Sequence, residues 1–137
     1  MGRSILAIVA GVVTITVLAV GGDAVMQRAV PSAFDANGFS DKMPVLLAML
    51  VYMTVFSGVG GWVTAVGTRA GLRDVWILAG LQFVMTLAAN IMLFDRRLLW
   101  FYGVGLILMP VAIVAGGRFR AWGAGRATQT LAAAPQR

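Results

Sequence analysis

The chain alternates between long stretches without charge and short segments that hold almost all of its charged residues. The uncharged stretches are residues 4–22, 43–68, 75–94 and 98–117. An α-helix rises about 1.5 Å per residue, so about 20 apolar residues cross the ~30 Å hydrocarbon layer of a bilayer. The pattern therefore predicts an all-α integral membrane protein with four transmembrane helices.

The charged segments predict how these helices are connected. With their polar flanks included, the predicted helices cover residues 4–29, 43–68, 74–94 and 98–118 of one membrane domain, residues 1–137. A loop at residues 30–42 joins the first two helices, and a tail at residues 119–137 follows the last. The other two connections are so short that the helices they join must be antiparallel neighbours, which predicts an up-down bundle.

The amino-terminal segment has a second interpretation, because a basic residue, an apolar run and small residues are also typical of a cleavable signal peptide. The apolar run is longer than the usual 7–15 residues of such a peptide, which favours a retained helix.

Basic residues predict the orientation of the bundle, because Lys and Arg collect on the cytoplasmic side of membrane helices. Cytoplasmic termini place seven basic residues inside, namely Arg3, Arg69, Arg73, Arg118, Arg120, Arg126 and Arg137. Four remain outside, namely Arg28, Lys42, Arg96 and Arg97. We therefore expect both termini and the tail in the cytoplasm, the loop outside, and interface anchors at Trp76, Trp100, Tyr102 and Trp122.

The composition excludes most familiar catalytic and metal sites. The chain is 60% hydrophobic and has no Cys and no His, and its five acidic residues are all Asp. Disulfides, thiolate ligands and the most common general base are therefore absent. We expect no enzymatic activity, no catalytic residue, no metal site and no cofactor, although a bound lipid is compatible with this composition.

The net charge of +6 is explained by helix flanks that face anionic lipids, and no basic stripe with interleaved aromatic residues points to nucleic acid. Ten of the eleven basic residues are Arg, and Ala, Gly and Val are abundant. This usage is typical of a GC-rich bacterial genome, and it suggests a multi-pass protein of the bacterial inner membrane.

Polar residues within the apolar stretches are the candidates for function, because each needs a partner in hydrocarbon. Gln82, Thr86 and Asn90 recur at every fourth position and so share one helix face. Asp23 and Gln27 lie at a similar depth to Asn90, which predicts a hydrogen-bonded cluster of these three residues. The polar face is either a set of hydrogen bonds between helices or part of a transport pathway.

Small residues at helical spacing predict close helix packing. The candidate positions are Ala7, Gly11, Ser57, Gly61, Ala65, Ala112 and Gly116. Pro110 removes one backbone donor inside the fourth helix and is a candidate hinge.

Two functions are compatible with these features. The first is a non-catalytic accessory or scaffold subunit, which packs its small-residue faces against a larger membrane complex or against copies of itself. The alternative is a minimal oligomeric transporter or channel for a small or lipid-like solute, with the Gln82, Thr86 and Asn90 face lining its path.

Overall fold

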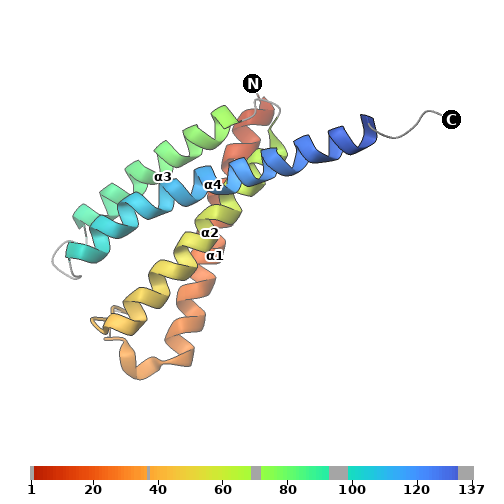
Figure 1. Ribbon diagram of the computed structural model, residues 1–137. Helices are drawn as coiled ribbons and strands as arrows, with labels where there is room; N and C mark the ends of the chain where they lie inside the picture. The colour runs from red at the N-terminus through yellow and green to blue at the C-terminus, as the bar shows by residue number, and fades with distance from the viewer. Residues whose placement is uncertain (1, 37, 69–71, 93–98, 133–137) are drawn as a thin grey trace.

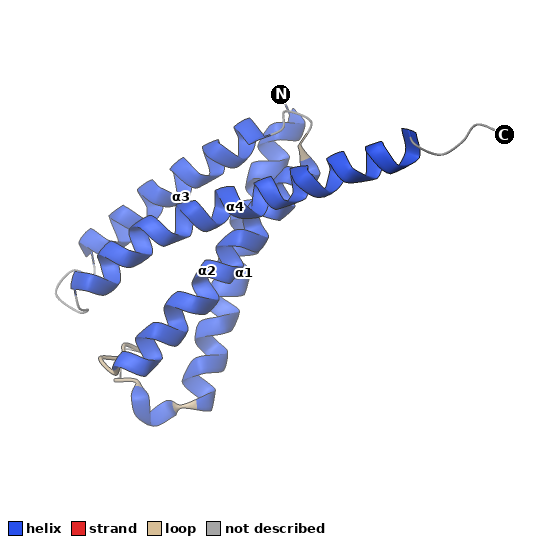
Figure 2. Cartoon of the chain, viewed as in Figure 1, coloured by secondary structure: helices blue, strands red, loops and turns tan. Residues whose placement is uncertain are grey.

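A computed structural model describes residues 2–36, 38–68, 72–92 and 99–132 of the chain. All of the regular structure in these ranges is helical (Figure 2). Four long helices account for nearly all of it, and each is long and apolar enough to cross a membrane. They are α1 (Gly2–Ala29), α2 (Met43–Gly67), α3 (Leu72–Met92) and α4 (Leu99–Ala132), and a short 3-10 helix, η1 (Pro31–Ala33), follows α1.

The helix boundaries agree with the predicted ones to within two residues, except at the end of α4. Residues 93 and 94, which the sequence adds to the third helix, and residue 98 lie outside the described residues. At the carboxyl end, α4 continues to Ala132, whereas the sequence predicts that the helix stops at residue 118. The continuation is rich in Ala and Arg and holds no Pro, so a helix that is already nucleated can propagate through it.

In Figure 1, α1 lies along α2 and α3 lies along α4, and we call these the two helix pairs. The most extensive contact in the described chain, however, joins the pairs and lies between α2 and α4. Within the first pair, Gly22 of α1 lies against Tyr52 of α2, and Ala7 of α1 lies against Gly67 of α2. The two pairs meet where α4 crosses α2, and they diverge toward the segment that joins α1 to α2 (Figure 1). We call these two regions the crossing and the loop end.

The crossing brings backbone against backbone because it is built from glycine. A Cβ atom added at Gly61 of α2 would overlap the carbonyl group of Ile113 in α4, and one added at Gly116 would overlap the carbonyl of Gly58. Small residues allow membrane helices to approach this closely and so to gain van der Waals contact.

Two buried clusters stabilise the arrangement. The crossing cluster consists of Ile15, Val75, Leu78, Ala79, Ile113 and Val114 and draws on α1, α3 and α4. The loop-end cluster consists of Ala33, Val45, Leu46, Met49, Leu50, Phe101 and Tyr102, so the first turn of α4 packs against the first two turns of α2. Elsewhere large apolar side chains are exposed along all four helices, as expected of surfaces that face lipid.

The residues predicted to pack helices lie at contacts within the chain. Ala7, Gly11, Ser57 and Gly61 are buried, and Ala65 packs against the crossing cluster. Ala112 lies beside Gly58, and Gly116 lies at the crossing. The small-residue faces are thus used between helices of this chain.

The predicted interface anchors divide into two groups. Trp76 and Trp122 are exposed, as an anchor in the headgroup layer must be. Tyr102 is buried in the loop-end cluster, whereas Trp100 is half-buried and packs against that cluster. Tyr102 differs from the prediction because the first turn of α4 packs against the first two turns of α2.

Candidate functional site: a cavity lined by all four helices

A cavity of about 340 Å³ lies between the two helix pairs, and all four helices contribute to it. Its position follows from the fold: the pairs are in backbone contact at the crossing and diverge toward the loop end (Figure 1). The volume lies at the lower end of the range of small-molecule sites, about 300–1,000 Å³. The lining residues are Ile15, Ala19, Met53, Phe56, Ser57, Gln82, Met85, Thr86, Ala89, Asn90, Phe101, Tyr102 and Met109.

The polar face of α3 lines one wall of this cavity. Gln82, Thr86 and Asn90 are all half-buried, and each is among the lining residues. The Gln82 Nε2 atom donates a hydrogen bond to Thr86 Oγ1 at 3.4 Å. The spacing of four residues brings the two side chains together one turn apart. The stripe identified from the sequence therefore lines a partly open cavity to which all four helices contribute.

The lining also includes a polar group of α2 that the sequence assigned only to helix packing. Ser57 of α2 is 1% exposed and lines the cavity. Its hydroxyl is the only fully buried side-chain polar atom without a hydrogen-bond partner in the part of the chain that the structure describes. An unsatisfied buried hydroxyl costs about 1–3 kcal/mol, so this position gains from any molecule that bonds to it.

The structure does not bring Asp23, Gln27 and Asn90 together. Asp23 accepts a hydrogen bond from the Tyr52 hydroxyl of α2, and Gln27 lies beside Gly38 in the segment after η1. Asn90, by contrast, lines the cavity on α3. Asp23 and Gln27 lie on α1, which packs against α2 at the loop end, whereas Asn90 lies on α3 in the other helix pair (Figure 1). The three residues therefore do not form the predicted cluster.

One buried acid lies at the opposite end of the molecule, where the sequence suggests a solvated loop charge. Asp74, in the first turn of α3, is 3% exposed, and its carboxylate accepts a hydrogen bond from the Thr68 hydroxyl. A carboxylate in the first turn of a helix is also favoured by the helix dipole. These contacts give Asp74 a structural role in joining α2 to α3, away from the cavity.

The cavity is electrically neutral in its described lining. Its polar atoms belong to amides and hydroxyls, and no Asp, Lys or Arg is among the lining residues that the structure describes. Within the same described ranges, no group of three potential ligand residues could hold a metal ion. Such a lining can donate and accept hydrogen bonds, but it offers no counter-ion to a charged ligand.

Pro110, the candidate hinge, lies within a helix that continues on both sides of it. It lines a separate pocket of about 370 Å³ with Trp76 and Arg118 and does not line the cavity between the pairs.

Comparison of the chain with protein-family models, with curated proteins and with solved structures finds no match.

Proposed function

We propose that this chain is a small multi-pass membrane protein that takes a lipid-like solute from the bilayer into the cavity between its two helix pairs. One observation carries the proposal: the polar stripe of α3 and the unpartnered hydroxyl of Ser57 line the same cavity within helices that are apolar enough to span a membrane. Polar groups inside a membrane that do not satisfy one another mark candidate ligand sites. Solute binding of this kind is the first step of a minimal transporter.

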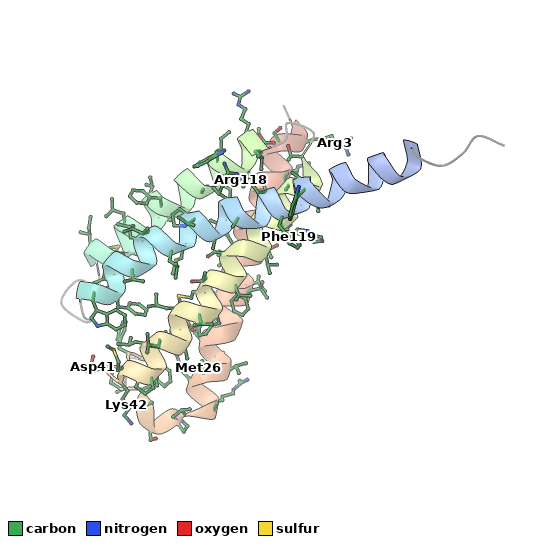
Figure 3. All side chains as sticks on the ribbon, viewed as in Figure 1. Arg3, Met26, Asp41, Lys42, Arg118 and Phe119 are labelled. Carbon is green, nitrogen blue, oxygen red and sulfur yellow. The ribbon has the colours of Figure 1, made fainter. Side chains whose placement is uncertain are left out.

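We further propose an up-down antiparallel bundle with both termini in the cytoplasm. The contacts of α1 with α2 run in opposite order along the two helices, which supports this arrangement. Arg3 and Arg118 lie toward one end of the molecule, and Asp41 and Lys42 lie at the loop end (Figure 3). The excess of Arg on the first side supports a cytoplasmic location for it, and the Arg-rich composition favours a bacterial inner membrane.

Cysteine labelling tests the orientation without background, because the natural chain has no Cys. Asp41 and Arg73 are both exposed, so each accepts a substitution without loss of packing. In intact cells we expect Asp41→Cys to react with a membrane-impermeant maleimide, and Arg73→Cys to react only after the cells are lysed. The reverse pattern would contradict the proposed orientation.

Native mass spectrometry of the protein purified in a mild detergent tests the function. We expect the wild-type protein to retain a lipid-like molecule from its membrane, and Asn90→Leu to retain it at no more than a third of that occupancy. Thr16→Leu is the matched control, because Thr16 is exposed on α1, outside the cavity. Its occupancy should equal that of the wild type. No bound molecule, or equal occupancy in Asn90→Leu, would refute the proposal.

The accessory or scaffold role, which the sequence analysis placed first, becomes the second candidate. The same purification would reveal it as stoichiometric recovery of another membrane protein. Its support from the sequence is weaker once the chain is folded, because Gly11, Gly60, Gly61 and Gly116 all lie against other helices of the same chain.

A further inference from the structure

The lining of the cavity carries polar groups that restrict which lipid-like molecule fits into it. We propose that the cavity selects a lipid whose polar head is uncharged and bears a free hydroxyl group, as in a diacylglycerol, and that Ser57 is a hydrogen-bonding contact for that head. This inference rests on the proposed function and adds the class of ligand to it.

The absence of charge from the described lining argues for an uncharged head. A phosphate that enters an apolar cavity loses its hydration, and the loss is tolerable only when a cation or several strong donors replace the water. Here the polar residues of the lining, apart from Tyr102, offer the amides of Gln82 and Asn90 and the hydroxyls of Thr86 and Ser57. These groups solvate a neutral head well and an anion poorly.

The hydrogen-bonding pattern argues for a hydroxyl within that head. Gln82 already donates from Nε2 to Thr86, so its Oε1 atom is available as an acceptor that needs a donor from the ligand. The Ser57 hydroxyl can donate and accept, and it has no partner among the described residues. A ligand hydroxyl can do both, whereas an ester or ketone oxygen can only accept.

The rest of the cavity suits an apolar body. Met53, Met85 and Met109 line it from three different helices, and the aromatic rings of Phe56 and Phe101 line it from α2 and α4. Methionine side chains are flexible and polarizable, so they adapt to the irregular shape of an acyl chain. The ligand would thus place its head between Gln82 and Ser57 and its chains against this apolar lining.

A matched pair of lipids tests the class of ligand. We would titrate the delipidated wild-type protein in detergent with 1,2-dioctanoylglycerol and with dioctanoyl phosphatidic acid, which differ only in the phosphate, and count bound molecules by native mass spectrometry. We expect the dissociation constant for dioctanoylglycerol to be at least tenfold lower than that for the phosphatidic acid.

A matched pair of variants tests the contact with Ser57. Ser57→Ala removes the unpartnered hydroxyl, and we expect it to weaken dioctanoylglycerol binding about fivefold, the effect of one net hydrogen bond of about 1 kcal/mol. Thr54→Val is the control, because the Thr54 hydroxyl on the same helix donates to the Leu50 carbonyl at 2.6 Å and does not line the cavity. Its dissociation constant should not change.

The possible failures are distinguishable. If neither lipid binds, the proposed function and the inference both fail. If both lipids bind with equal affinity, or the phosphatidic acid binds more tightly, a lipid site exists but the inferred class of ligand is wrong. If dioctanoylglycerol binds Ser57→Ala as tightly as it binds the wild type, Ser57 is not a contact for the head.

Discussion

The crossing and the loop end are both places where α2 meets α4, but they are packed by different means. At the crossing, Gly58 and Gly61 of α2 lie directly against the backbone of Ile113 and Gly116 in α4. At the loop end, the same two helices are held apart by large side chains such as Leu46 and Phe101. Small residues at one end and large ones at the other set the two helices at an angle, and the cavity lies on the open side.

Residues beside the crossing are correspondingly the most completely buried. Thr64, Val75, Leu78 and Ile113 have no exposed surface, and the Thr64 hydroxyl lies 3.0 Å from the Gly60 carbonyl and 3.3 Å from the Ala7 carbonyl. The residues that line the polar wall of the cavity are only half-buried. The crossing is therefore the most tightly packed contact between α2 and α4, and the cavity is packed less tightly on its polar side.

The largest effect is expected from substitution at the crossing. Gly61→Ala places a methyl group on the carbonyl of Ile113, which is backbone and can only move with its helix. Overpacking of this kind typically costs 1–3 kcal/mol, occasionally more, and we expect Gly61→Ala to lower the free energy of unfolding by about 3 kcal/mol. An unfolding titration with sodium dodecyl sulfate in mixed micelles measures the free energy of unfolding of the variant and of the wild type.

A second glycine provides the control for this substitution. Gly103 of α4 has open space where a Cβ would lie, so Gly103→Ala should leave the free energy of unfolding unchanged or raise it by up to about 1 kcal/mol through helix propensity. Equal stability of the two variants would show that the crossing does not hold the helix pairs together.

The crossing also shows how much of the fold the sequence could predict. The uncharged stretches predict four helices, and the structure confirms them, because the length of an apolar run is a local property. Spacing of four residues likewise placed Gln82, Thr86 and Asn90 on one face. Small residues identified candidate contacts, but nothing in their spacing says which helix each one meets.

The errors have the same origin, since each depends on which helices are neighbours. Asp23 was expected near Asn90 because the two lie at a similar depth, yet its partner is Tyr52. Tyr102 was expected at the headgroups, but it is buried against α2. The depth of a residue along a predicted helix and the helix face that it shares can be predicted from one sequence. The angle between the helix pairs cannot, because it arises from the packing of residues that are distant in the chain.

A smaller effect is expected at the loop end, where the bond between Tyr52 and Asp23 joins α2 to α1. Tyr52→Phe removes this hydrogen bond and keeps the ring, which packs on Phe56 with centroids 5.5 Å apart. Polar bonds between membrane helices are worth about 0.6 kcal/mol on average and up to about 1.7, so we expect a loss within that range, below the loss in Gly61→Ala.

A double-mutant cycle with Asp23→Ala separates the bond from the other contacts of Tyr52. The coupling free energy from unfolding titrations should favour the pair by about 0.5–1.7 kcal/mol. A coupling near zero would mean that the bond adds nothing to the pairing of α1 with α2. A coupling larger than the loss in Gly61→Ala would reverse the comparison, because a contact at the loop end would then contribute more to the free energy of unfolding than the backbone contact at the crossing does.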